Sequence, residues 1–258
     1  MSGSVAEPLL QARELRKNYG SVQALRGASF DIAAGEVVAL IGDNGAGKST
    51  LVKCLSGVER PDSGEILIDG RPVVLDSPTA ARELGIETAY QDLAVAPDLD
   101  PAANLFLGRE LRRPGLLGAL GMLDKVTMRT RAAEHFARLG VTLQSLDVPI
   151  GSLSGGQRQS VAVARSVVWA SRVVFLDEPT AALGVVQRER VLDVIRAVRD
   201  DGVAVVLISH NMPEVLAVAD RIEVLRMGAR VARFAAADVT LEQLVGAMTG
   251  ALTQEDDR

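Results

Sequence analysis

Unbroken runs of apolar residues recur along the chain and end at turn residues. The clearest are residues 37–41, 173–176 and 203–208, none of which contains a polar position. Strands of a parallel sheet have this pattern when helices cover both faces, because side chains on both faces are then buried. The sequence therefore predicts an α/β fold with a mostly parallel core sheet.

Two pairs of shorter segments predict antiparallel hairpins. Residues 65–69 and 71–75 lie on either side of Gly70, and residues 221–226 and 230–234 lie on either side of the turn at 227–229. A turn residue between two β-prone runs is the usual hairpin signal. The simplest assembly is a parallel core with an antiparallel sheet at its edge.

Helices are indicated by their first residues. Ser77 before Pro78 predicts a helix ending near Gly85, and Thr240 with Gln243 three residues later forms a capping-box pattern that opens a C-terminal helix.

Between residues 98 and 149 the strand signal disappears, and residues 122–139 have a helical pattern that stops at Gly140. The middle of the chain therefore predicts a helical subdomain inserted into the α/β core.

Composition narrows the class of protein. The 258 residues include 28 basic and 33 acidic side chains, and 48% are hydrophobic. This length fits one large α/β domain or two small ones, and the apolar content excludes a disordered chain. A net charge of −5 provides no general attraction to nucleic acid, so no nucleic-acid partner is expected.

Several features favour an intracellular protein. The one cysteine, Cys54, cannot form an internal disulfide, and we expect it to be a small buried side chain. Residues 1–17 lack the charged and apolar regions of a secretory signal. No run approaches the ~18 to 20 apolar residues that span a bilayer.

Residues 42–49 match the phosphate-binding pattern Gly-x4-Gly-Lys-Ser/Thr. The glycines let backbone N–H groups turn inward toward a phosphate, Lys48 adds a positive charge for the β- and γ-phosphates, and Ser49 adds a hydroxyl for Mg²⁺. The pattern follows a buried apolar run and opens a helix over 48–57, as expected for a phosphate-binding loop. The alternative, a glycine-rich turn without a ligand, does not require this context. The candidate nucleotide-binding residues are Gly42, Asp43, Asn44, Gly45, Ala46, Gly47, Lys48, Ser49 and Thr50.

Two carboxylates follow the apolar run at 173–176. Asp177 is placed to hold Mg²⁺ directly or through water, and Glu178 to orient and polarise an attacking water. Alone, this pair is equally typical of an acidic turn after a buried strand. Together with the upstream phosphate-binding loop it predicts phosphoryl transfer to water.

A second anion-binding helix start follows Leu153. Ser154, Gly155 and Gly156, with Gln157, precede a helical pattern over about 158–169, and the alternative is an ordinary capped helix. A chain with one phosphate-binding loop has no use for a second such helix end in the same site. We therefore expect this end to serve a γ-phosphate held by another subunit.

These motifs together resemble the ATP-binding subunit of the ABC transporter family over roughly residues 9–250. The resemblance implies a P-loop NTPase of ABC type that binds ATP and Mg²⁺ between two copies, hence a homodimer. It implies one ATPase domain over 1–258, with an α/β core at about 9–91 and 170–250. A helical subdomain with the signature motif is expected at about 92–169, and a frayed tail at 251–258.

The resemblance assigns three more residues. Gln91 matches the glutamine that senses Mg²⁺ and water, His210 the histidine that contacts the γ-phosphate, and Tyr19 the aromatic residue that stacks on adenine. The catalytic set is then Glu178, His210, Gln91 and Lys48, and the metal set is Ser49, Gln91 and Asp177. The simpler alternatives are a loop histidine and a structural tyrosine.

One position departs from the family. The aspartate that usually follows the 178–183 motif, and that helps to couple the two sites of the dimer, is replaced by Gly184. The residues expected for hydrolysis are all present.

Ser77-Pro78 and residues 90–93, 104–110 and 178–184 are similar to the bacterial importers of monosaccharides such as fructose, ribose and xylose. That branch implies membrane-spanning permease subunits, an extracytoplasmic sugar-binding protein and a peripheral position on the cytoplasmic face of the bacterial cell membrane. Residues 115–123 either contact the permease or pack within the helical subdomain. A non-transport ABC ATPase and a non-hydrolysing regulatory subunit remain alternatives.

Overall fold

The computed structural model describes residues 7–89, 95–143, 145–181 and 183–252. The chain divides into two compact units, the first formed by residues 1–88, 170–178 and 198–258 and the second by 89–169 and 179–197. Residues 179–197, which the sequence placed in the α/β core, thus group with the helical unit. Gln91 and residues 253–258 of the expected tail lie outside the described residues.

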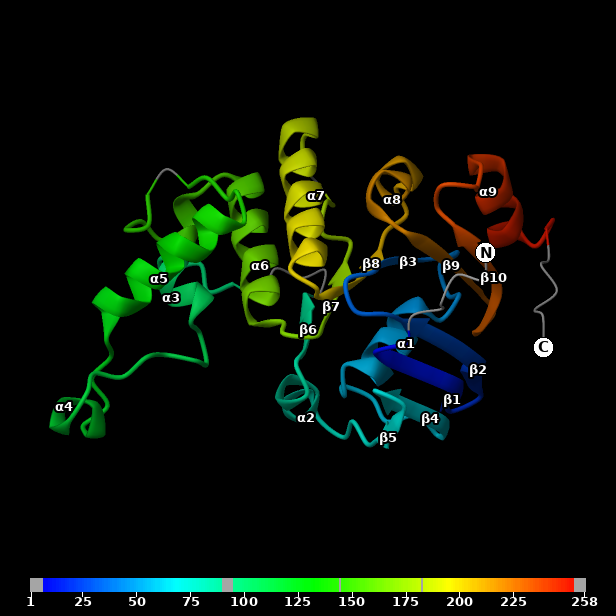
Figure 1. The fold of residues 1–258 in the computed structure, drawn as a ribbon, viewed down its shortest axis with the longest axis horizontal. Helices are drawn as coiled ribbons and strands as arrows, with labels where there is room; N and C mark the ends of the chain where they lie inside the picture. The colour runs from blue at the N-terminus through cyan, green and yellow to red at the C-terminus, as the bar shows by residue number, and fades with distance from the viewer. Residues whose placement is uncertain (1–6, 90–94, 144, 182, 253–258) are drawn as a thin grey trace. The chain divides into compact units, whose positions relative to one another are not determined.

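The strands form two sheets (Figure 1). An antiparallel sheet has the order β2-β1-β4-β5, and a larger mixed sheet has the order β10-β9-β3-β8-β7-β6. Their bounds are β1 Leu10–Tyr19, β2 Val22–Ile32, β3 Val37–Ile41, β4 Ser63–Ile68, β5 Arg71–Val73, β6 Ile86–Ala89, β7 Val173–Asp177, β8 Ala204–Ile208, β9 Arg221–Arg226 and β10 Ala229–Ala235.

Strand pairing confirms the predicted core. β3 pairs in parallel with β8 and β9, and β7 pairs in parallel with β8. Both predicted hairpins are present, as β4–β5 and β9–β10. The long β1–β2 pair, with several shifts in its register, was not predicted, because its exposed positions give no regular alternation.

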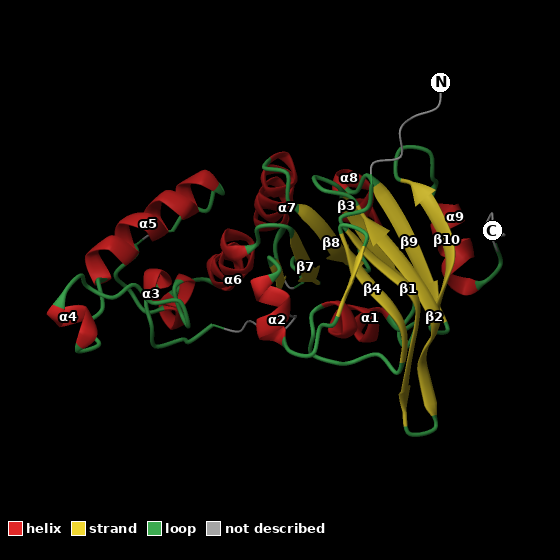
Figure 2. Cartoon of the chain, turned by 60° about the horizontal axis from the view of Figure 1, so that its bottom comes forward, coloured by secondary structure: helices red, strands yellow, loops and turns green. Residues whose placement is uncertain are grey.

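The named elements of the second unit are helical, whereas the first unit contains both strands and helices (Figure 2). The first unit contains α1 Lys48–Leu55, α2 Pro78–Glu83, α8 Met212–Val218 and α9 Leu241–Thr249. The second contains α3 Pro101–Leu105, α4 Leu116–Ala119, α5 Lys125–Arg138, the 3₁₀ turn Ile150–Ser152, α6 Gly155–Trp169 and most of α7 Val185–Asp200. Among the described residues, no helix has both the length and the apolar character needed to cross a bilayer.

The predicted caps of α2 and α9 are both confirmed. Ser77 Oγ accepts a hydrogen bond from Ala80 N–H at the start of α2, and Thr240 and Gln243 form the reciprocal capping box of α9. The helix expected from residue 122 begins at Lys125 instead, because Asp124 caps it by accepting from Thr127 N–H. Residues 122–124, which the sequence included in the helix, therefore precede it.

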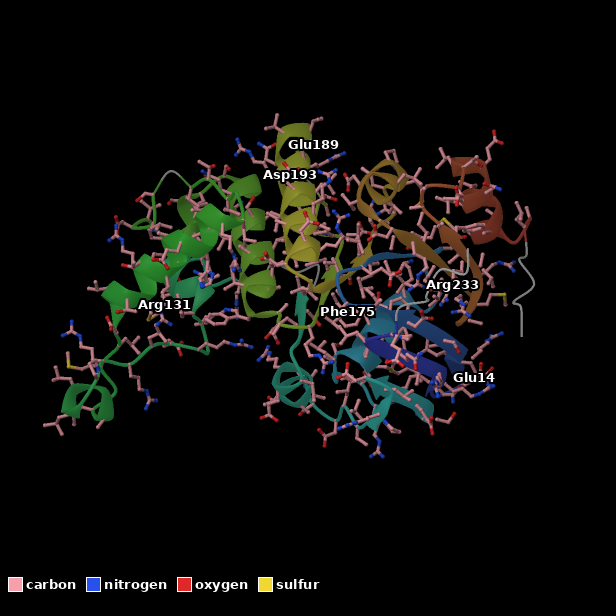
Figure 3. All side chains as sticks on the ribbon, viewed as in Figure 1. Glu14, Arg131, Phe175, Glu189, Asp193 and Arg233 are labelled. Carbon is pink, nitrogen blue, oxygen red and sulfur yellow. The ribbon has the colours of Figure 1, made fainter. Side chains whose placement is uncertain are left out.

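The core lies on both faces of β3, whose side chains alternate between them. Val38 and Leu40 pack in a hydrophobic cluster together with residues of α1 and of the antiparallel sheet. Phe175 (Figure 3) and Cys54 belong to the same cluster. Burial raises the pKa of the Cys54 thiol to about 11. Ala39 and Ile41 face the opposite cluster, formed with α8 and α9. Helices on both faces explain why the strand has no polar position.

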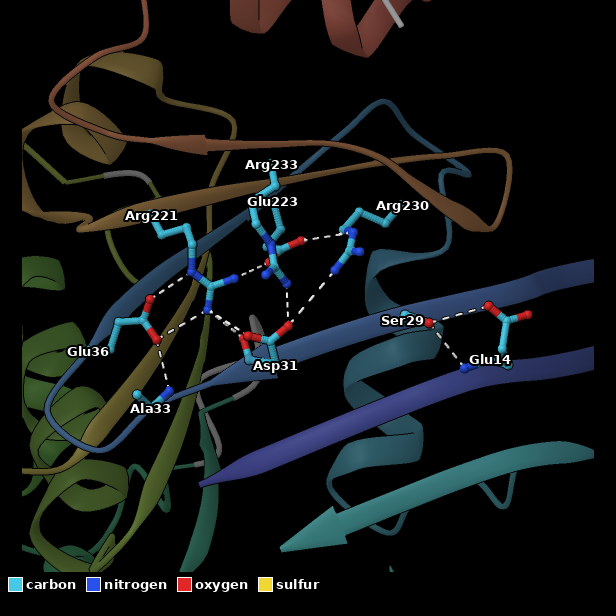
Figure 4. A network of polar contacts seen from close by, with 9 residues as sticks. All are labelled: Glu14, Ser29, Asp31, Ala33, Glu36, Arg221, Glu223, Arg230 and Arg233. Atoms are coloured by element: carbon cyan, nitrogen blue, oxygen red, sulfur yellow. Dashed lines mark hydrogen bonds and ion pairs between the residues drawn. The ribbon is translucent and has the colours of Figure 1, made fainter. Parts of the chain in front are cut away.

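A buried ionic network joins the two sheets (Figure 4). Glu223 of β9 is fully buried and pairs with Arg221 of its own strand and with Arg230 and Arg233 of β10. Arg221 and Arg233 also pair with Asp31 of β2. Burial raises the pKa of Glu223, and the three guanidinium groups oppose that shift. The network therefore depends on the carboxylate to balance clustered positive charge.

Glu223→Ala is expected to lower the free energy of unfolding by about 3–5 kcal/mol, because it removes the fully buried carboxylate and leaves three half-buried arginine side chains with Asp31 and Glu36 as their remaining counter-charges. Urea unfolding measures this loss, with the exposed Glu65→Ala as a matched control. A loss below about 1 kcal/mol, the range of surface ion pairs, would contradict the structural role of this network.

Candidate nucleotide-binding site

The candidate site lies at the carboxyl ends of three neighbouring strands of the first unit. β7 and β8 are in register with Asp177 opposite Ile208, and β8 lies between β7 and β3. Because these strands are parallel, the loop after β3, Glu178 after β7 and His210 after β8 leave the sheet at one edge. This is the edge at which α/β sheets bind ligands.

Two glycines of the phosphate-binding loop cannot carry a side chain. Gly42 has a φ of 150°, and a Cβ there would lie 2.2 Å from the carbonyl oxygen of Leu225. Gly47 has a φ of 102°, and its Cβ would lie 2.7 Å from the carbonyl oxygen of Ala24. The loop thus requires glycine because neighbouring backbone approaches it closely, as well as for its conformation.

Backbone hydrogen bonds fix this loop from outside. Gly228 N–H donates to Ala46 O at 2.9 Å, and Gly228 O accepts from Arg26 N–H at 2.7 Å. Gly228 was predicted only as part of the β9–β10 turn. Nothing local in the sequence indicates that this turn packs against the loop that contains Ala46, 182 residues earlier.

Lys48 opens α1 and lies over the loop. Its Nζ donates to Gly42 O at 2.6 Å and to Asp43 O at 3.0 Å. Burial lowers the pKa of Lys48, while the negative charges of Glu178 and Asp177 oppose that shift. The ammonium group is thus held among backbone oxygens that a phosphate group can replace. Asp43, Asn44, Gly45 and Ser49 are exposed, and Thr50 is half-buried.

Glu178 and His210 form a direct pair. His210 Nδ1 lies 2.8 Å from Glu178 Oε1, and Glu178 has a left-handed φ of 52°. The His210 side chain is 80% exposed, whereas that of Glu178 is 16% exposed. The sequence indicated both residues but not their contact, which follows from β7 and β8 being neighbours. The histidine covers the carboxylate and itself faces solvent.

The donor set fits Mg²⁺. Burial and the charge of Glu178 raise the pKa of Asp177, and the charge of Lys48 opposes that shift. Mg²⁺ in phosphate sites uses one or two carboxylate or hydroxyl ligands, with phosphates and water completing its shell. Asp177 and the Ser49 hydroxyl are oxygen donors of this type. Among the described residues, no group of three or more His, Cys, Asp or Glu side chains forms a metal site on its own.

Tyr19 ends β1 next to the phosphate-binding helix. Its hydroxyl forms a side-chain hydrogen bond with Thr50, and burial and the charge of Glu59 raise its pKa. Lys17 Nζ lies 5.6 Å from the ring centroid. The Tyr19 residue is 42% exposed. Its stacking on adenine stays a prediction.

In the second unit, Ser154 and Gln157 cap α6. Gln157 N–H donates to Ser154 Oγ at 3.3 Å, and Ser154 N–H donates to Gln157 Oε1 at 3.2 Å. Gly155 and Gly156 are the first two residues of the helix. The motif thus forms a capped helix start, with the Ser154 hydroxyl engaged in the cap.

Gln187 of α7 lies beside the start of α6, a position that the sequence did not indicate. A Cβ on Gly156 would lie 2.6 Å from Gln187 Cγ, and a Cβ on Gly184 would lie 2.7 Å from Gln187 Oε1. Gln187 and the capped helix start line one cavity of about 200 Å³. The missing side chain at 184 therefore leaves room for Gln187 beside the signature glycines. Gly184 directly precedes α7, and its position three residues before Gln187 was the available signal.

The fold and the loop after β3 define a P-loop nucleotide-binding protein, and comparisons with known proteins specify the family. The model of the ABC transporter family matches residues 25–181. The chain is 51% identical over 247 residues to the fructose import ATP-binding protein FrcA of Rhizobium meliloti, covering 95% of both chains. It is 42% identical over 241 residues to the xylose/arabinose import ATP-binding protein XylG of Sulfolobus acidocaldarius, covering 93% of this chain and 94% of that one.

The chain also matches a ribose import ATP-binding protein, RbsA 2 of Burkholderia pseudomallei, with 42% identity over 244 residues, and it spans 47% of the length of that relative. The solved structure of cbiO1 from Clostridium perfringens, part of the ABC transporter complex cbiONQ, superposes with a TM-score of 0.75 and 28% identity over 93% of both chains. The chain belongs to the ABC transporter family, which confirms the resemblance predicted from its motifs.

Gly184→Asp should displace Gln187, so its cost should depend on that neighbour. We expect the substitution to lower the free energy of unfolding by about 1 kcal/mol more in the native background than in Gln187→Ala. A double-mutant cycle by urea unfolding measures the coupling. Equal costs in both backgrounds would contradict the packing of Gln187 against position 184.

Proposed function

We propose that this protein is the ATP-hydrolysing subunit of an ABC transporter that imports a monosaccharide, such as fructose, ribose or xylose. The observation that supports hydrolysis is the convergence of Lys48, Asp177, Glu178 and His210 at one edge of the parallel sheet. The sugar class rests on the fructose, xylose/arabinose and ribose import relatives, since none of these side chains recognises a sugar.

Nucleotide binding is assigned to the phosphate-binding loop and Tyr19. Backbone N–H groups of residues 42–47 and of the first turn of α1 bind the β-phosphate. Lys48 Nζ then donates to phosphate oxygens in place of the carbonyl oxygens of Gly42 and Asp43. Tyr19 stacks on adenine, with its hydroxyl positioned by Thr50. Ser49 and Asp177 are the Mg²⁺ ligands, and Gln91 is the third predicted ligand. Mg²⁺ supplies charge neutralisation on the β- and γ-phosphates when it is bound.

Hydrolysis is assigned to Glu178. Its carboxylate accepts a hydrogen bond from the attacking water and aligns that water with the γ-phosphorus atom. The 2.8 Å contact with His210 fixes the orientation of the carboxylate. His210 then extends from this carboxylate toward the γ-phosphate, which explains why its ring remains exposed before the nucleotide is enclosed.

The second half of the site is provided by another copy of the chain. Ser154, Gly155, Gly156 and Gln157 form the helix start that closes on the γ-phosphate of the partner, so two copies enclose two nucleotides. Closure requires the Ser154 hydroxyl to leave its cap or to share it with the phosphate. In this proposal both compact units belong to one ATPase domain over residues 1–258.

The membrane partners follow from the import relatives. The homodimer is peripheral on the cytoplasmic face of the bacterial cell membrane, bound to membrane-spanning permease subunits and working with an extracytoplasmic sugar-binding protein. Co-purification with a multi-spanning membrane protein, followed by sugar uptake in reconstituted vesicles, tests this role. Purification without such a partner, together with normal growth of a deletion strain on single sugars, would refute it.

Lys48→Ala is expected to remove most nucleotide affinity, because the charge that faces the β- and γ-phosphates is lost. We expect a decrease of at least about tenfold, the equivalent of roughly one charge-assisted hydrogen bond. Isothermal titration with Mg-ATP measures it, and Lys53→Ala, on the same helix outside the loop, is the control. Unchanged affinity would refute the assignment of the loop.

Glu178→Gln is expected to keep ATP binding and to lose turnover by at least about 100-fold, the contribution typical of a positioned base. The variant should accumulate as an ATP-bound dimer, which light scattering coupled to size exclusion detects. The exposed Glu189→Gln on α7 is the matched control. Normal phosphate release by Glu178→Gln would exclude this residue as the group that positions water.

A further inference from the structure

An exposed apolar element lies outside the nucleotide site, in the helical unit. Residues 112–123, here called the leucine hairpin, contain α4 and lie beyond the first turn of α5 in both ribbon views (Figures 1 and 2). Leu116 is 77% exposed and Leu120 is 73% exposed, and Leu117 and Met122 are also exposed. Large apolar side chains gathered at one tip mark an interaction surface.

The hairpin has a defined structure. Its base is closed by backbone hydrogen bonds from Arg113 N–H to Met122 O at 2.9 Å and from Asp124 N–H to Leu111 O at 2.7 Å. At its tip, Gly118 is buried, and a Cβ there would lie 1.8 Å from Arg113 O. The short helix therefore packs on its own base through a glycine and turns its leucines outward.

The charge around the hairpin is positive, although the chain as a whole carries −5. Residues 110–131 include five basic side chains and two acidic ones, a net of +3, and no acidic residue lies within 112–123. Figure 3 labels one of the basic residues, Arg131 on α5. Asp124, one of the two acids, is engaged in capping α5. Arg112 and Arg113 are exposed, and two residues separate them from Leu116.

We propose that the leucine hairpin inserts into an anionic phospholipid surface. Leu116, Leu120 and their neighbours enter the boundary between headgroups and acyl chains, while Arg112 and Arg113 bind lipid phosphates. Apolar side chains flanked by basic ones are the pattern of interfacial membrane contacts. A lipid surface also fits a projecting element better than a protein does, because fluid lipid needs no complementary cavity.

This contact goes beyond the proposed ATPase function and does not rest on it. It needs neither nucleotide nor permease, so a failure of the hydrolysis assignment leaves it unaffected. In the assembled transporter it adds to the attachment that the permease provides, and it orients the helical unit relative to the bilayer.

Vesicle flotation of the purified full-length chain tests the proposal. Binding is expected to mixed phosphatidylglycerol–phosphatidylcholine vesicles, to be much weaker to phosphatidylcholine alone, and to fall as salt screens the arginines. Leu116→Asp/Leu120→Asp should abolish binding. The control Val22→Asp/Val74→Asp changes two exposed valines of the first unit (63% and 66% exposed) and should bind as the native chain does.

The arginine contribution is measured separately. Arg112→Gln/Arg113→Gln should weaken binding to the anionic vesicles by roughly fivefold for each charge removed. Arg60→Gln/Arg71→Gln, with two exposed arginines of the first unit, is the control. Unchanged basal ATP hydrolysis and unchanged urea unfolding would show that the hairpin variants are folded.

Two outcomes would overturn the proposal. One is the absence of binding to anionic vesicles by the native chain, and the other is equal binding by the leucine variant. The second outcome has a special case, in which the leucine variant also loses its co-purification with the permease. That result would assign the hairpin to a protein partner.

Discussion

The parallel pairing of β3, β8 and β7 is the constraint on which the rest of this protein depends. It places the carboxyl ends of three buried strands side by side, so that residues far apart in sequence leave the sheet at one edge. Because β3 also buries both of its faces, any shift in its register would expose core side chains. Packing and chemistry are therefore fixed by the same pairs of strands.

Charged side chains around this sheet form two different kinds of cluster. At the site, the negative charges of Asp177 and Glu178 oppose the lowering of the Lys48 pKa by burial, and Lys48 opposes the raising of the Asp177 pKa. Between the two sheets, Glu223 and its arginines are balanced internally, and there the ion pairs hold β2 against β9 and β10. The charges at the site suit a ligand that binds and dissociates, whereas the ion pairs between the sheets suit a permanent structural contact.

Much of the fold and of the candidate site could be predicted from the sequence. The features that could not be predicted have physical causes. Residues 42–49 and Asp177 could be predicted as site residues because their chemistry is local to one strand end and one loop. The Glu178–His210 contact, the approach of Gly228 to the loop and the packing of Gln187 depend on which segments become neighbours in space. The start of α5 was missed because an apolar residue before the cap, Met122, continues the helical pattern although Asp124 begins the helix.

The single cysteine of the chain has a practical consequence. Cys54 lies in the interior behind the phosphate-binding loop, and almost none of its sulfur is in the reactive thiolate form at neutral pH. The native protein therefore has no surface thiol that reacts with maleimides. One thiol introduced at any exposed position would carry a fluorophore or spin label alone, and the movements of this protein could be followed without first removing a native residue.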